Sequence, residues 1–184
     1  MNVIEIEHVT KKYGNFLAVN DISFEVREGE IFGFLGINGA GKTTLLKCAV
    51  GQAPIINGSI EVLGRDPRTF TDQELITFVG YVPQEPSDLL YGQSVEEECA
   101  LADQDNKVHS GSTLKIYSEL MNIPSLSAHP RDISEGQRLG LALSIILSAQ
   151  PKIVILDEPT RGLDYEAKRV LVQNLKDIAH RQKR

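Results

Sequence analysis

The sequence has no unbroken apolar run of the roughly eighteen residues that a membrane-spanning helix needs. Its N-terminus, MNVIEIEHVT, alternates apolar and acidic residues, whereas a secretion signal places a basic region before an apolar one. Low-complexity tracts and internal repeats are also absent. We therefore expect neither secretion nor membrane insertion, and predict a soluble globular protein.

Cysteine is scarce, with 2 residues, Cys48 and Cys99. Their separation does not match the close spacing of metal ligands, and one of them lies within an apolar helical pattern. We predict two reduced thiols in a cytosolic protein, with a disulfide between them as the less favoured alternative.

Basic residues are outnumbered, with 19 Lys and Arg against 25 Asp and Glu and a formal net charge of -6. This balance disfavours nucleic acid as the main partner, because nucleic-acid surfaces select basic proteins. Hydrophobic residues make up 41% of the 184 residues, which is enough for one or two packed units.

Strand patterns alternate with helical ones along much of the chain. The run at 42–50 has helical spacing, and a nearly all-apolar run at 31–36 is typical of a central strand covered on both faces. Strands that alternate with helices indicate a wound, parallel sheet, and the two N-terminal runs predict an antiparallel part. We predict strands in the segments 3–9, 18–26, 31–36, 58–64, 79–84 and 151–160.

The middle of the chain changes character and has helical spacing with little strand pattern. The segments SVEEECALA and STLKIYSELM, and the run from Gly136 to Ala149, carry this spacing. We therefore predict an α/β core made of residues 1–86 and 151–184, with residues 87–150 inserted as a helical subdomain.

A glycine-rich loop, GINGAGKT at residues 36–43, fits the phosphate-loop pattern and lies between a predicted strand and a predicted helix. Glycines let backbone amides surround phosphate oxygens, and the helix N-terminus favours an anion. Lys42 would bridge the β and γ phosphates of ATP, and Thr43 would hold Mg²⁺ through its hydroxyl. The alternative is a plain strand-to-helix turn. The pattern predicts the core of a P-loop NTPase.

A phosphate loop also requires an acidic site, and the segment IVILDE supplies one. Its apolar residues put Asp157 at the end of a buried strand, where it could orient Mg²⁺ and its water, with Glu158 beside it. Taken alone, such a pair is more often a helix cap or a surface turn. Together with the glycine loop, however, the pair is better interpreted as an Mg²⁺ site.

The remaining motifs resemble the nucleotide-binding domain of ABC-type ATPases, from about Ile4 to the end of the chain. Tyr13, in KKYGNFLAV, matches the aromatic residue that stacks on adenine in that family; alone it would be an ordinary tyrosine at a strand end. The segment YVPQ matches the glutamine loop, which implies that Gln84 touches Mg²⁺ and the attacking water.

Two further motifs match parts of the family that meet a second subunit. ISEGQ at 133–137 resembles the signature LSGGQ, with Glu135 in place of its first glycine, and RGLD ends in Asp164. The resemblance implies catalytic roles for Lys42, Gln84 and Glu158, and metal binding by Thr43, Gln84 and Asp157. It implies nucleotide contacts from Tyr13, Gly36, Asn38, Gly39, Ala40, Gly41, Lys42, Thr43, Thr44, Ser134, Gly136, Gln137 and Asp164.

In that family two subunits close ATP between them, and each ATP is held by one glycine loop and the other subunit's signature. The resemblance thus implies an ATPase that uses ATP and Mg²⁺, with Glu158 as general base. It also implies a second ATPase subunit, homologous or identical, and transmembrane permease subunits that place the chain on the inner face of the cell membrane.

The sequence departs from the family after its aspartate loop, because the chain ends at DIAHRQKR. A further strand and a histidine that contacts the γ-phosphate normally follow, and His180 lies instead in the helical run, where it fits a solvated helix end. We therefore expect nucleotide binding with weak hydrolysis, and a sheet short of one edge strand.

The two halves resemble different branches of the family. The segments 1–26 and 36–47 are most similar to ATPases of drug or haem exporters, and residues 129–168 to those of energy-coupling-factor importers. The character changes near residues 80–95, and a divergent natural protein, a truncated gene and an engineered fusion are the open explanations. The direction of transport, the substrate and the pairing with itself or a relative are open. Two alternative functions are a non-hydrolysing nucleotide-binding fragment for assembly or regulation, and a soluble ATPase acting on DNA or ribosomes.

Overall fold

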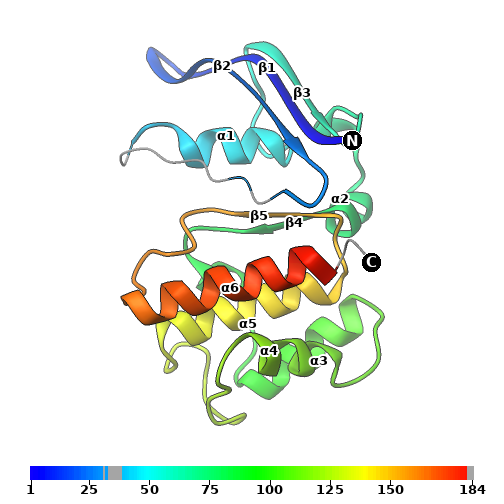
Figure 1. The fold of residues 1–184 in the computed structure, drawn as a ribbon, viewed down its shortest axis with the longest axis vertical. Coiled ribbons are helices and arrows are strands. Elements are labelled where there is room, and N and C mark those ends of the chain that lie inside the picture. Colours follow the sequence, from blue (N-terminus) through cyan, green and yellow to red (C-terminus); the bar gives the residue numbers. More distant parts are fainter. Residues whose placement is uncertain (31, 33–38, 182–184) are drawn as a thin grey trace. The chain divides into compact units, whose positions relative to one another are not determined.

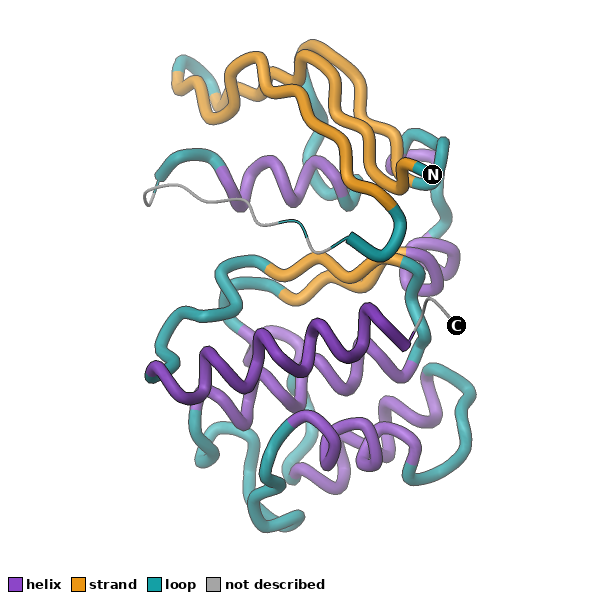
Figure 2. The backbone as a smooth tube through the Cα atoms, viewed as in Figure 1, coloured by secondary structure: helices purple, strands orange, loops and turns teal. Residues whose placement is uncertain are grey.

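The structure, a computed structural model, describes residues 1–30, 32 and 39–181. The chain forms two compact units (Figures 1 and 2). The first unit consists of Met1–Leu75 with the residues from Lys176 onward, and the second unit is Ile76–Leu175.

The first unit is built on a three-stranded antiparallel sheet with the order β2-β1-β3 (Figure 2). Strands β1 (Asn2–Tyr13) and β2 (Phe16–Arg27) form a hairpin, and β3 (Asn57–Val62) pairs with the other edge of β1. The apolar residues that alternate along these strands turn one face inward, where helix α1 (Lys42–Ala49) packs against all three strands.

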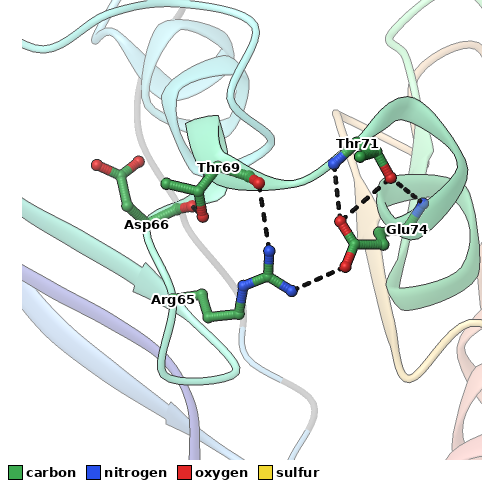
Figure 3. Close-up of polar contacts among 5 residues, drawn as sticks. All are labelled: Arg65, Asp66, Thr69, Thr71 and Glu74. Atoms are coloured by element: carbon green, nitrogen blue, oxygen red, sulfur yellow. Dashed lines mark hydrogen bonds and ion pairs between the residues drawn. The ribbon is translucent and has the colours of Figure 1, made fainter.

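A short segment closes the first unit after β3. It contains the 3-10 helix η1 (Pro67–Thr69) and the start of helix α2 (Asp72–Phe78). Glu74 accepts a hydrogen bond from the backbone amide of Thr71 at 2.9 Å and forms an ion pair with Arg65 at 3.0 Å (Figure 3). Arg65 and the Thr71 amide hold the pKa of Glu74 down at about 2. These contacts fix the beginning of α2.

The second unit contains two parallel strands, β4 (Val79–Val82) and β5 (Ile153–Leu156), paired residue for residue from Val79 and Ile153. Helix α5 (Glu135–Ser148) packs against β4 and also against helices α3 (Val95–Asp105) and α4 (Ser112–Leu120). The 3-10 helix η2 (Pro86–Leu89) follows β4, and α6 (Tyr165–Arg181) follows β5 and continues into the first unit. The helical core contains Val95, Cys99, Tyr117, Ile133 and Leu141.

The fold class predicted from the sequence is confirmed: an antiparallel sheet precedes a parallel one, and helices occupy the middle of the chain. The predicted strand at 31–36 lies outside the described residues except for residue 32. Helix α2 was not predicted. Position 180 lies in a helix, as expected.

Both cysteines are unpaired and buried, as the sequence predicts. Burial raises the pKa of Cys99 to about 12, so this thiol stays protonated at neutral pH. Within the described part of the chain, every helix is too short or too polar to cross a membrane.

Candidate functional site

The end of the glycine loop lies in the first unit, directly before α1. Gly39 and Gly41 have φ angles of 85° and 79°, in the left-handed region that glycine adopts without strain. Helix α1 begins at Lys42, and its first intrahelical bond runs from the amide of Leu45 to the carbonyl of Gly41 at 2.9 Å. Gly36 and Asn38, two predicted site residues, lie outside the described residues.

Gly41 is also held closely against the hairpin. A methyl group at this position would lie 1.9 Å from the carbonyl oxygen of Ala18, which is far inside van der Waals contact. Glycine is therefore required here both by backbone conformation and by space. The close approach fixes the start of α1, whose first-turn amides have no acceptor within the helix and so favour an anion.

Tyr13 lies at the last position of β1, where the hairpin turns, and is paired with Phe16. Its side chain is 51% exposed. The tip of this hairpin and the N-terminal end of α1 lie at the same end of the first unit (Figure 1). The first unit thus brings Tyr13 to the end of the sheet where Lys42, Thr43 and Thr44 begin the helix, two residues after Ala40.

The carboxyl ends of the parallel strands bring three predicted site residues together in the second unit. Val82 pairs with Leu156, and the amide of Asp157 donates to the carbonyl of Val82 at 3.0 Å. Two residues beyond this pair, the Nε2 atom of Gln84 lies 3.4 Å from Oε2 of Glu158. The register therefore places Gln84 and Glu158 in contact although 74 residues separate them.

Asp157 is 2% exposed, and its two carboxylate oxygens differ in environment. Tyr81 donates its hydroxyl to Oδ2 at 3.3 Å, whereas Oδ1 is buried and has no hydrogen-bond donor among the described residues. Burying a carboxylate oxygen that receives no hydrogen bond costs free energy of folding unless a cation binds to it. The donor set fits Mg²⁺, which prefers carboxylate oxygens. Burial and then the Asp157 charge raise the pKa of Tyr81 to about 12, so its proton stays available to this bond.

Replacing the buried carboxylate by an amide tests this account. We expect Asp157→Asn to raise the free energy of unfolding by about 1 kcal/mol in EDTA, because a charged group is replaced by a neutral one of the same shape. Urea titration in EDTA measures this, with the exposed Asp88→Asn as the matched control. A lower stability for Asp157→Asn in EDTA would show that the carboxylate is satisfied without a metal.

A pocket of about 160 Å³ opens beside these carboxylates within the second unit. Glu158, on its wall, has a φ angle of 50°, in the left-handed region that is uncommon outside glycine, and five other non-glycine residues of the described chain share it. The pocket is lined by Pro83, Gln84, Glu85, Pro86, Glu135, Leu139, Asp157, Glu158, Pro159, Arg161 and Gly162.

The signature-like motif forms the N-terminus of α5. Ser134 caps this helix: its hydroxyl accepts the amide of Gln137 at 3.2 Å, and the Gln137 side chain accepts the amide of Ser134 at 3.0 Å. The Gln137 side chain, a predicted nucleotide contact, therefore stabilises its own helix here. Among the residues that the structure describes, a methyl group at Gly136 would meet Leu163 alone, at 3.5 Å, so their packing does not require glycine there.

Asp164 is predicted to contact the second subunit of a dimer, and it also makes a hydrogen bond within its own chain. Its Oδ1 atom accepts the amide of Ala167 at 2.8 Å at the start of α6, as an N-cap does. Glu135, which replaces a glycine of the signature, forms an ion pair with Arg138 at 3.3 Å, and its side chain lies against Gly162. The loop after Asp157 and the start of α5 are thus in contact within the second unit.

Sequence reasoning missed Tyr81 and Arg161. Tyr81 is the residue of β4 that pairs with Ile155, and its hydroxyl reaches Asp157. A parallel register that pairs Val82 with Leu156 would have suggested that Tyr81 lies close to the residue after β5. Arg161 lines the pocket but carries no sequence signal beyond its place in RGLD.

Known proteins with similar sequences point to one family. The family model for ABC transporters matches residues 19–161. An ABC transporter ATP-binding protein of Streptomyces avermitilis is 44% identical over 177 residues, and one of Methanosarcina mazei is 34% identical over 180 residues. Each alignment covers 96% of this chain but 32% and 36% of the relative, so the chain spans about a third of their length.

Solved structures show the same fold. The cbiO1 protein of Clostridium perfringens, part of the transporter complex cbiONQ, has a TM-score of 0.83 at 24% identity, covering 98% of this chain and 74% of that one. A dimeric ATP-binding cassette, MJ0796, bound to ADP and phosphate, has a TM-score of 0.82 at 22% identity, covering 97% and 84%. With a family model matched over most of its length, this chain belongs to the ABC transporter family, as an ATP-binding cassette.

Proposed function

We propose that the chain binds and hydrolyses Mg-ATP and that this powers transport through partner membrane subunits. The observation that carries the proposal is the arrangement at the ends of β4 and β5. Gln84 contacts Glu158 there at 3.4 Å, beside a buried Asp157 whose Oδ1 atom has no donor among the described residues. This group suits metal-assisted attack of water on a phosphate.

The phosphates of ATP are held by the glycine loop and the start of α1. The left-handed backbone at Gly39 and Gly41 suits a loop whose amides surround a phosphate, and the helix N-terminus adds a favourable dipole. Lys42 supplies a positive charge for the β and γ phosphates, and Tyr13 stacks on the adenine.

A magnesium ion would be held by the hydroxyl of Thr43 and the oxygens of Gln84 and Asp157, and would supply charge neutralisation for the phosphates. Asp157 is suited to metal binding because its Oδ1 atom is buried and receives no hydrogen bond from the described residues. The glycine loop and the acidic group belong to different compact units, and their action on one nucleotide is part of the proposal.

Glu158 acts as the general base that takes a proton from the attacking water. Gln84, in contact with Glu158, orients that water by hydrogen bonding. Glu158 lines the pocket of about 160 Å³, where a water can reach its carboxylate.

A second cassette completes the site in this proposal. Ser134 is exposed at the N-terminus of α5, and Gly136 has room beside it for an approaching group. The solved relative MJ0796 is a dimer and cbiO1 is part of a transporter complex, which supports a dimer and membrane subunits for this chain. The chain would then work on the inner face of the membrane.

The first experiment measures Mg-ATP binding and phosphate release by the 184-residue chain. We expect Lys42→Ala to weaken Mg-ATP binding by about a hundredfold, because a charge-assisted contact to two phosphates is lost. Lys47→Ala, on the exposed side of the same helix, is the matched control and should bind as the unchanged chain does. Equal binding by both variants would refute a phosphate site at α1. Binding without any phosphate release would leave a nucleotide-binding role and refute hydrolysis.

A further inference from the structure

The lysine two residues before Tyr13 is buried, which is rare for this residue type. Lys11 is 7% exposed, whereas its neighbour Lys12 is exposed. Lysine is almost never fully buried unless its ammonium has a partner. One contact of this ammonium is with the Tyr13 ring, with Nζ 4.8 Å from the ring centroid, and its charge also acts on the buried Cys48 thiol.

This geometry is a cation-π contact, since the ammonium lies within about 6 Å of the ring centroid. Lys11 and Tyr13 are two residues apart on β1, and the strand pairing is irregular between Lys11 and Lys12, so the contact between the two side chains is given by their positions and not by simple strand alternation. Tyr13 stays 51% exposed, whereas Lys11 is 7% exposed. The ammonium contacts the ring, and about half of the surface of Tyr13 stays accessible to a ligand.

The same part of the hairpin anchors the glycine loop. Lys11 pairs with Val19 across the two strands, and a methyl at Gly41 would meet Ala18 and Val19. The residue that holds the Tyr13 ring and the residue that fixes the start of α1 thus contact one short stretch of β2. A base stacked on Tyr13 and phosphates at α1 would be positioned by one rigid element.

We propose that Lys11 is a positioning residue for nucleotide binding: its ammonium holds the ring of Tyr13, so that the accessible part of the ring receives the adenine base. This rests on the proposed function, because it requires the base of ATP to stack on Tyr13. The cation also draws electron density from the ring, which favours stacking of the electron-rich purine.

Two probes separate this role from a structural one. Mg-ATP carries base and phosphates, whereas Mg-tripolyphosphate carries phosphates alone. We expect Lys11→Met to weaken binding of Mg-ATP by about fivefold, the size of a cation-π contact with a half-exposed ring, and to leave binding of Mg-tripolyphosphate unchanged. Lys11→Arg keeps a cation over the ring and should bind Mg-ATP as the unchanged chain does. Lys12→Met is the matched control.

A double-mutant cycle gives the second test, with Lys11→Gln as the alternative variant if Lys11→Met does not fold. In the background of Tyr13→Leu, removing the Lys11 charge should no longer change Mg-ATP affinity. Equal loss of affinity for both probes, or the same loss with and without the Tyr13 ring, would assign Lys11 a general structural role and overturn the proposal. Mg-ATP binding that Lys42→Ala weakens but Lys11→Met does not would overturn the positioning role alone. A chain that binds neither probe would overturn the proposed function as well.

Discussion

Replacing Glu158 by glutamine is expected to lower phosphate release by about a hundredfold or more while Mg-ATP binding is kept. Glutamine has the shape of glutamate and can keep the contact with Gln84 at 3.4 Å, but its amide cannot accept a proton from water. The unusual backbone at Glu158, with φ at 50°, imposes the same strain on both residues, so the fold is preserved. The measurement is single-turnover phosphate release with Mg-ATP in excess of its dissociation constant.

The control for this change is Glu96→Gln, which removes an exposed carboxylate from α3 in the same unit. It should leave phosphate release unchanged, whereas Glu158→Gln should retain ATP for many turnover times of the unchanged chain. Phosphate release at the full rate from Glu158→Gln would assign the base to another group. Loss of Mg-ATP binding in this variant would instead give Glu158 a part in holding the nucleotide.

The elements that carry chemistry were the most predictable part of the fold. Buried strands such as Ile153–Leu156 are short apolar runs ended by a polar pair, and a phosphate loop followed by helical spacing predicts α1. The carboxyl ends of parallel strands lie at one edge of a sheet, so the proximity of Gln84 and Glu158 follows from recognising both strands. The hydrophobic pattern of the sequence and the topology of a parallel sheet are enough to predict such contacts.

Helix α2 was missed although the sequence holds its signal. Thr71 and Glu74 are spaced as a capping box, and the Glu74 amide does donate to the Thr71 hydroxyl at 3.2 Å, beside the bond in the opposite direction (Figure 3). The helix spans 7 residues, too few for a helical period to stand out against neighbouring strand-like residues. The capping residues Thr71 and Glu74 would have predicted this helix, whereas the spacing of its apolar residues does not.

A sequence motif does not tell whether a side chain stabilises the fold or contacts a ligand. Gln137 and Asp164 both match motif positions, and both make capping bonds within this chain. Lys11 shows the reverse: it matches no motif, and its contact with Tyr13 depends on the register of the hairpin, which has several irregularities between residues 2 and 12. A bulge reverses the face of every later residue, so such a contact requires coordinates.

Gly41→Ala is expected to lower the free energy of unfolding by about 3 kcal/mol or more and to abolish Mg-ATP binding. Two costs add at this position. The left-handed backbone, with φ at 79°, disfavours any side chain by about 1 to 2 kcal/mol. The new methyl would also lie 1.9 Å from the carbonyl oxygen of Ala18, so the start of α1 or the hairpin must move.

Gly39→Ala separates these two costs and is the matched comparison. Gly39 has a similar φ of 85°, but a methyl there would have open space within 4 Å among the described residues, so only the conformational cost of about 1 kcal/mol applies. Urea titrations of the unchanged chain, Gly39→Ala and Gly41→Ala measure the backbone cost and the steric cost. Gly14→Ala, with a φ of 55° and open space for a methyl group, is the control in the hairpin turn. Equal losses at Gly39 and Gly41 would mean that backbone strain alone sets the cost. A larger loss at Gly41 would show that its approach to β2 fixes where the first turn of α1 begins, and therefore where its amides can hold a phosphate.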